Sequence, residues 1–293
     1  MQRRLQTAAG LLRSRQWIKN GFVFAGMLFG GRFGSLDSWI RVATTFVLFS
    51  AVASATYINN DLTDREADRR HPVKRLRPIA AGEVSPSVAR GVQLLLLVVG
   101  MAGAALLDPR VLAVVAAYFA LNLAYSAFLK HQVVIDVMVI AVGFVMRVLA
   151  GCYAVRVEPS VWILLCTFLL ALYLGFGKRR HELLLADAGM VGHREVLGQY
   201  SIKMLDQMIV VVSALTVTSY IMFTVWPDTV SRHGTTNLVY TVPFVLYGLF
   251  RYDFLIYQAE DGGNPTDAML TDRPLLMTMI AWAFTSVAII YWR

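Results

Sequence analysis

A series of long apolar segments constrains the fold of this chain more than any other feature. Of its 293 residues, 57% are hydrophobic, above the roughly 45–50% of an average soluble domain. Most of the nine apolar stretches are long enough to cross the ~30 Å hydrocarbon core of a bilayer as helices. They cover residues 18–34, 39–59, 85–107, 110–128, 133–152, 160–176, 206–226, 237–257 and 275–292. The sequence therefore predicts an all-α integral membrane protein with nine transmembrane helices.

The first apolar stretch is interrupted more than the others. Lys19 and Asn20 lie near its start, and Gly30-Gly31 ends it early. The preceding residues, 1–17, carry several arginines and are expected to lie at the cytoplasmic surface of the membrane. No low-complexity run or soluble linker divides the chain, so residues 1–293 are predicted to form a single polytopic domain.

Lysine and arginine are distributed unequally between the two predicted sides. If the amino terminus is cytoplasmic, the inner side carries 20 of the 27 basic residues and the outer side carries six. By the positive-inside rule the amino terminus is then inside and the carboxyl terminus outside. The net charge of +8 reflects this bias rather than nucleic-acid binding, because no soluble basic domain is present. We expect a multi-pass protein of the cell inner (plasma) membrane whose active site faces the cytoplasm.

Three inner connections are long and polar, at residues 60–84, 177–204 and 251–273. Long polar loops gathered on one face commonly carry function. The third contains the turn-rich run Glu260-Asp261-Gly262-Gly263-Asn264-Pro265. Cys152 and Cys166 are the only cysteines and both belong to apolar stretches, so neither a disulfide framework nor a cysteine metal cluster is expected.

Two ionisable residues fall within or beside the fifth stretch. Arg147 lies inside it, and because a charge in lipid is costly we expect it to face the interior of the helix bundle. Asp136 lies near its start, where water could reach the carboxylate.

The first long inner loop begins with an aspartate motif. It reads Asn60-Asp61-Leu62-Thr63-Asp64-Arg65-Glu66-Ala67-Asp68. On one continuous helix, the three aspartates fall within about 60° of one another and share a face. Mg²⁺ binds a few carboxylates and completes its shell with water and substrate phosphates. We expect Asp61, Asp64 and Asp68 to be catalytic metal ligands, although a solvated helical face with an Asp61–Arg65 pair could produce the same pattern.

Basic and polar side chains on the same side are candidates for phosphate or substrate binding. Positive-inside bias alone could explain individual lysines and arginines, a tyrosine at an interface is often an anchor, and Lys178 with Glu182 could be only an intrahelical pair. The predicted substrate-binding residues are Lys19, Asn60, Lys74, Arg77, Tyr125, Lys130, Lys178, Arg179 and Glu182.

The aspartate motif, Tyr125-Ser126 and Lys130 after the fourth stretch, and the nine stretches together resemble the UbiA superfamily of intramembrane prenyltransferases. The resemblance covers almost the whole chain. It implies a Mg²⁺-bound diphosphate whose ionisation drives group transfer, with a second aspartate-rich motif after the sixth stretch. Here that second position is basic, Lys178-Arg179-Arg180-His181-Glu182.

This departure is similar to one branch of the superfamily, which transfers 5-phosphoribose from 5-phosphoribosyl 1-diphosphate to decaprenyl (polyprenyl) phosphate and releases pyrophosphate. That branch supplies precursors of cell-wall arabinan. One acidic, magnesium-binding pole and additional basic poles suit a donor with phosphate at both ends of a small sugar. A UbiA-type enzyme with a prenyl diphosphate donor and an aromatic or other small acceptor is the alternative. A membrane transporter ranks lower, because the polar groups gather at one face and transporter sites lie near the bilayer midplane.

Overall fold

The computed structural model describes residues 2–187, 195–258 and 265–292, and every regular element in these ranges is a helix. Residues 260–264, which make up most of the turn-rich run, lie outside these ranges. The elements are α1 (Gln2–Leu12), η1 (Ser14–Phe24), α2 (Ala25–Leu28), α3 (Leu36–Thr63), α4 (Arg65–Arg70), η2 (Lys74–Leu76), α5 (Pro86–Leu107), α6 (Pro109–Ala127), η3 (Leu129–His131), α7 (Ile135–Ala154), α8 (Val161–Asp187), η4 (Glu195–Gln199), α9 (Ile202–Val225), α10 (Pro227–His233), η5 (Asn237–Thr241), α11 (Val242–Tyr257), α12 (Pro265–Thr271) and α13 (Arg273–Tyr291).

Eight helical segments in the described residues are long and apolar enough to cross a membrane. They correspond to the second to ninth predicted stretches, and α8 continues beyond the sixth apolar stretch to Asp187. Residues 18–34 do not form the predicted long transmembrane helix. This segment contains the 3₁₀ helix η1, followed by the four-residue α2. Gly30-Gly31 explains the early end, since Gly31 adopts a φ of 72° that does not continue a helix.

Polar side chains fix where several of the long helices begin. Ser35, Ser85 and Ser201 each accept a hydrogen bond from the backbone N–H three residues later, at the starts of α3, α5 and α9. Asp272 caps α13 in the same way and also receives two hydrogen bonds from Arg251, at 2.7 and 3.1 Å. These hydrogen bonds from Arg251 hold the pKa of Asp272 below its usual range. The arginine thereby links the two ends of the third inner loop.

The described residues form two compact units. Unit 1 comprises residues 1–130 and 146–158, and unit 2 comprises residues 131–145 and 159–293, so α7 contributes to both. The single-domain reading of the sequence stays a prediction.

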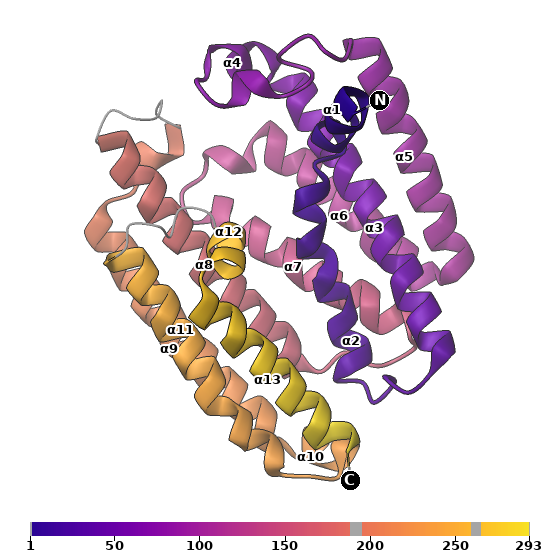
Figure 1. Cartoon of the computed structure of the whole chain (residues 1–293), viewed down its shortest axis with the longest axis vertical. Coiled ribbons are helices and arrows are strands. Elements are labelled where there is room, and N and C mark those ends of the chain that lie inside the picture. Colours follow the sequence, from indigo (N-terminus) through magenta and orange to yellow (C-terminus); the bar gives the residue numbers. More distant parts are fainter. Residues whose placement is uncertain (1, 188–194, 259–264, 293) are drawn as a thin grey trace. The chain divides into compact units, whose positions relative to one another are not determined.

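In unit 1, α3 packs against α5, α6 and the second half of α7 (Figure 1). Phe49, Val115 and Tyr118 are buried in this core. The segment η1 lies against α7 at a glycine: a Cβ on Gly151 would come within 1.8 Å of the carbonyl oxygen of Val23. Small residues permit such close backbone approach between helices in membranes, so this glycine explains how the irregular η1 packs into the unit.

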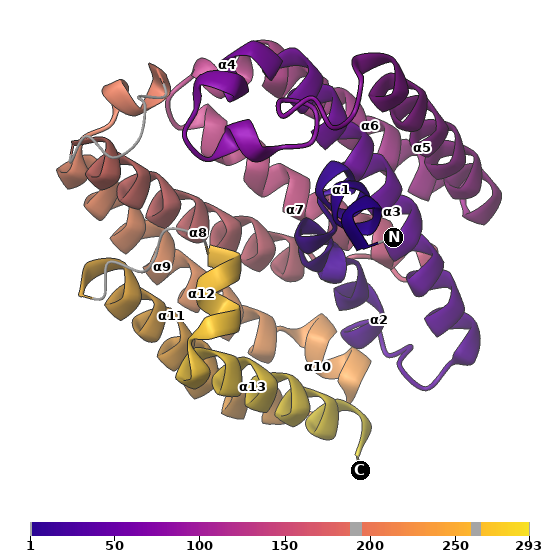
Figure 2. The same cartoon turned by 45° about the horizontal axis from the view of Figure 1, so that its top comes forward.

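Unit 2 is built from long helices that lie side by side. The helix α8 packs along α9, and α11 packs along α13, as both views show (Figure 2). The core contains Tyr173, Leu205, Ile209 and Tyr252, all buried. The Tyr173 hydroxyl donates to the Asp253 carboxylate at 2.7 Å, which provides that half-buried acid with a partner.

Candidate functional site

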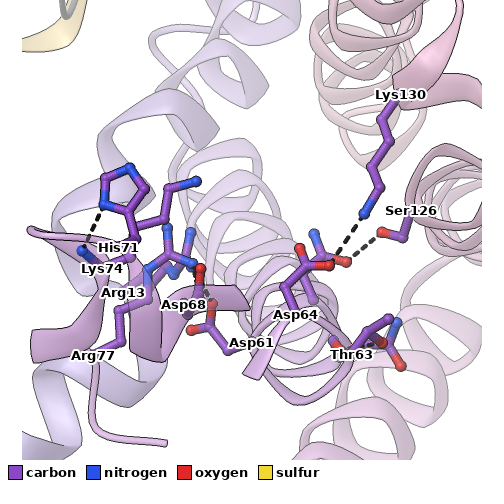
Figure 3. Close-up of polar contacts among 12 residues, drawn as sticks. Arg13, Asp61, Thr63, Asp64, Asp68, His71, Lys74, Arg77, Ser126 and Lys130 are labelled. Atoms are coloured by element: carbon purple, nitrogen blue, oxygen red, sulfur yellow. Dashed lines mark hydrogen bonds and ion pairs between the residues drawn. The ribbon is translucent and has the colours of Figure 1, made fainter. Parts of the chain in front are cut away.

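Two buried carboxylates of the aspartate motif converge on one guanidinium in unit 1. Asp61 and Asp68 are each 3% exposed. Nη1 of Arg77 lies 3.0 Å from Asp61 Oδ1 and 2.5 Å from Asp68 Oδ2. Arg13 also donates to Asp61 Oδ1 (Figure 3). For these two aspartates a solvated helical face is therefore excluded, and the pair with Arg65 is replaced by pairs with Arg77 and Arg13.

Asp64 lies apart from the other two aspartates. The helix α3 ends at Thr63 and α4 begins at Arg65, so Asp64 occupies the junction rather than a continuous helical face. Its carboxylate pairs with Lys130 Nζ at 3.1 Å (Figure 3). Asn60 accepts a hydrogen bond from the Ser126 hydroxyl of α6. The end of α3 is therefore joined to α6 by one side-chain contact, and Asp64 is joined to the following η3 by another.

The loop after α4 folds back over this cluster. Arg69 Nε donates to the Ala80 carbonyl oxygen at 3.3 Å, and Ile79 is buried against Leu11 of α1. His71 Nδ1 accepts two backbone hydrogen bonds, from residues 73 and 74, at 3.2 Å each. Burial and the neighbouring Lys74 lower the pKa of His71, so the neutral ring can keep this acceptor role. Lys74 itself is exposed.

Asp61 and Asp68 fit a divalent cation in both chemistry and arrangement. Carboxylate oxygens are the ligands that Mg²⁺ prefers, and here two of them are directed at one cationic atom, Arg77 Nη1. No group of three or more histidine, cysteine, aspartate or glutamate side chains within metal-binding reach occurs in the described ranges. A metal held here would therefore use these two carboxylates and take its remaining ligands from substrate and water.

A second polar cluster lies in unit 2, where α8 extends beyond its apolar part. Arg179 Nε pairs with Asp136 Oδ2 at 3.0 Å, and Arg179 also pairs closely with Glu182. Lys178 Nζ lies 3.7 Å from Glu182 Oε1, so the intrahelical pair that the sequence allows is present. The Tyr200 hydroxyl donates to Asp136 Oδ1 at 2.7 Å. Arg179 is thus paired with two carboxylates, Asp136 and Glu182. Each carboxylate has a second partner, Tyr200 for Asp136 and Lys178 for Glu182.

The idea that water could reach Asp136 is wrong, because its side chain is 0% exposed. The backbone before it is strained: Val134 has a φ of 69°, which is rare for a β-branched residue. The N–H of Val134 donates to the Tyr200 hydroxyl at 2.6 Å. Burial and the adjacent Asp136 raise the pKa of Tyr200, so its hydroxyl remains a donor to the carboxylate. Sequence reasoning missed Tyr200, which has no motif of its own.

The remaining predicted residues lie elsewhere in unit 1. Lys19 belongs to η1 and Tyr125 to the last turn of α6, and both are half-buried. Arg147 is buried, with its Nε 2.7 Å from Asn20 Oδ1 and its Nη2 3.1 Å from the Tyr118 hydroxyl. The prediction that Arg147 faces the interior is confirmed.

Arg13 is another residue that sequence reasoning overlooked. It lies between α1 and η1 with a φ of 49°, a conformation that costs a non-glycine residue roughly 1–2 kcal/mol. The one signal in the sequence was that Arg13 is a basic residue just before the first apolar stretch. Positive-inside bias alone also explains an arginine at that position. Strain at a residue that contacts a buried carboxylate is typical of functional sites.

The comparisons with known proteins agree on one family. Residues 21–272 match the model of the UbiA prenyltransferase family. The chain is 36% identical over 281 residues to the decaprenyl-phosphate phosphoribosyltransferase of Mycobacterium tuberculosis, covering 94% of this chain and 91% of the relative. It is 35% identical over 288 residues to that of Corynebacterium glutamicum, covering 96% and 85%. Its fold is similar to a UbiA homologue from Archaeoglobus fulgidus bound to GPP and Mg²⁺, with a TM-score of 0.70, 20% identity and 97% and 98% coverage.

Proposed function

The chain belongs to the UbiA prenyltransferase family, and we propose that it transfers 5-phosphoribose from 5-phosphoribosyl 1-diphosphate to a polyprenyl phosphate, with decaprenyl phosphate as the expected acceptor. The reaction releases pyrophosphate and supplies a precursor for cell-wall arabinan. One observation carries the proposal: the mycobacterial and corynebacterial relatives named for this activity align with 94–96% of the chain at 34–36% identity.

The acidic side chains of unit 1 form the metal pole of the proposed site. Asp61 and Asp68 would bind Mg²⁺ directly, and Asp64 and Asn60 would contact the metal only through water molecules of its shell. Bound Mg²⁺ would neutralise charge on the departing diphosphate. The burial of both carboxylates strengthens their attraction for a cation, because screening by water is weak there.

Basic side chains would hold the phosphate groups. In unit 1, Arg77, Lys74 and Lys130 are the proposed donors to the diphosphate, with Lys19 and Tyr125 contributing to substrate binding. On α8, Lys178 and Arg179 are the proposed phosphate-binding residues, and Glu182 orients both through its ion pairs. The acceptor phosphate oxygen attacks C1 of the ribose as the bond to the diphosphate breaks. No separate general base is required, because this nucleophile is already ionised.

The location of the protein follows from the same proposal. The apolar helices make it an integral membrane protein, and a polyprenyl phosphate acceptor requires that the reaction take place at a bilayer edge. The basic residues at the ends of the helices favour the cytoplasmic side of the inner membrane.

The test is a transfer assay with purified protein, Mg²⁺, labelled phosphoribosyl diphosphate and decaprenyl phosphate. The proposal expects label in an organic-soluble, lipid-linked product. If no labelled lipid forms while geranyl diphosphate is consumed with an aromatic acceptor, the chain is a prenyltransferase of the usual type. This is the alternative function, and geranyl diphosphate is the test donor because the similar archaeal structure is bound to GPP. Substrate uptake into proteoliposomes without a covalent product would favour a transporter.

A further inference from the structure

Two cations already bind the carboxylates that the proposed function assigns to the metal. Arg77 Nη1 bridges Asp61 and Asp68, and Arg13 pairs with the same Asp61 oxygen, Oδ1. We propose that Arg77 competes with the divalent metal for these two carboxylates, so that a metal binds well only when a diphosphate receives the displaced guanidinium. This proposal rests on the proposed function and deepens it by making Arg77 the residue that couples metal binding to donor binding.

Geometry sets up the competition. One nitrogen atom lies within 3.0 Å of both carboxylates. A Mg²⁺ ion bound to the same two oxygens at about 2.0–2.1 Å would need the space that this nitrogen occupies. Arg77 must therefore leave at least one carboxylate before the metal can bind both.

Charge explains why the displaced guanidinium needs a new partner. Asp61 and Asp68 carry two negative charges, and Arg13 with Arg77 carries two positive charges, so the cluster is neutral as it stands. A divalent cation would add two positive charges to a site where both carboxylates are 3% exposed. Uncompensated charge in such a place is costly. A diphosphate supplies the missing negative charge, and the planar guanidinium suits phosphate oxygens.

The position of Arg77 makes the exchange feasible. It follows η2 in extended backbone, with φ −66° and ψ 141°, and its side chain is 28% exposed while the carboxylates are buried. The guanidinium can thus turn from the carboxylates toward a phosphate without unfolding the buried Pro78-Ile79-Ala80 segment behind it.

The test measures Mn²⁺ binding to purified protein by electron paramagnetic resonance, with and without pyrophosphate, correcting for the Mn²⁺–pyrophosphate complex in solution. In the wild type, pyrophosphate should tighten Mn²⁺ binding by about tenfold or more, within the ~5–150-fold range of coupled sites. R77Q should bind Mn²⁺ alone about tenfold more tightly than wild type and should gain less from pyrophosphate. R75Q is the control, because Arg75 is an exposed neighbour and its loss changes the net charge equally.

Equal Mn²⁺ affinities in R77Q and R75Q would overturn the proposal. If R77Q does not fold, R77K and the wild type still decide it, since a wild-type Mn²⁺ affinity that pyrophosphate leaves unchanged also overturns the coupling. Neither ribose nor lipid takes part in this assay. Intact coupling in a protein without phosphoribosyl transfer would therefore refute the proposed function alone, and an active transferase without coupling would refute this inference alone.

Discussion

Replacing Asp136 with asparagine removes one charge from a buried ion pair in unit 2. The side chains of Asp136 and Arg179 are 0% and 3% exposed, and they meet at 3.0 Å. Asparagine keeps an oxygen for the Tyr200 hydroxyl, so the change is mainly one of charge. Removing one partner of a buried pair typically costs about 3–5 kcal/mol. Because Arg179 retains Glu182, we expect the lower end, about 3 kcal/mol.

The same helix offers a matched control. Arg180 meets Asp206 at the shorter distance of 2.7 Å, but the Asp206 side chain is 36% exposed. Since water screens such a pair, Asp206→Asn should cost less than about 1 kcal/mol. Burial rather than distance therefore decides which substitution is harmful.

The assay is unfolding of the purified protein in mixed micelles by titration with sodium dodecyl sulfate. Asp136→Asn should lower the unfolding free energy by about 3 kcal/mol, and adding Arg179→Gln should restore much of it, because no buried charge is then left without its partner. The reasoning is refuted if Asp136→Asn is no worse than Asp206→Asn, or if the double variant loses the sum of the two single losses.

Three further predictions concern unit 1 and the topology. Protonation of His71 removes an acceptor of two backbone hydrogen bonds, and the pKa of His71 is lowered in the folded protein. The loop should therefore be fully stable above about pH 6.5 and lose stability as the pH falls below that value. Limited proteolysis at pH 5.5–7.5 measures this loss, and cleavage of His71→Asn should not depend on pH. Gly151→Ala should destabilise the protein by about 1–3 kcal/mol, seen as a lower unfolding temperature, because its Cβ would meet the Val23 carbonyl oxygen at 1.8 Å; an unchanged temperature would contradict this packing. With the native cysteines replaced, a cysteine at Arg75 should react with a membrane-impermeant maleimide only in inverted vesicles and one at Thr236 only in intact cells; the reverse would invert the topology.

The helices were largely predictable because the bilayer demands long apolar segments, and eight of the nine predicted stretches became such helices within the described residues. The first stretch was the exception. Its buried contact at Gly151 lies more than 120 residues away in sequence, and hydropathy carries no information about such a partner. The break at Asp64 was equally invisible, since three aspartates at helical spacing fit one continuous helix as well as two joined ones.

The sequence predicted which types of side chain form the candidate site, but only partly which of these side chains contact one another. Asp61 and Asp68 could be recognised as candidate site residues because ionisable side chains at a membrane-spanning helix are costly and commonly mark functional sites. Arg13 could not, because its contact with Asp61 depends on a strained backbone and joins two residues that are 48 positions apart in the sequence. For Asp136, the partners Arg179 and Tyr200 arrive from distant parts of the sequence, so its burial follows from folding rather than from any local pattern.

The most direct test of the function is a competition between donors in one reaction. Purified protein with Mg²⁺ and decaprenyl phosphate receives equal amounts of phosphoribosyl diphosphate and geranyl diphosphate, together with an aromatic acceptor, and the consumption of each donor is followed against pyrophosphate release. Our account predicts that phosphoribosyl diphosphate alone is consumed, one molecule for each pyrophosphate released and each lipid-linked product formed, and that Asp61→Asn abolishes the reaction. Consumption of geranyl diphosphate with phosphoribosyl diphosphate left intact would contradict it.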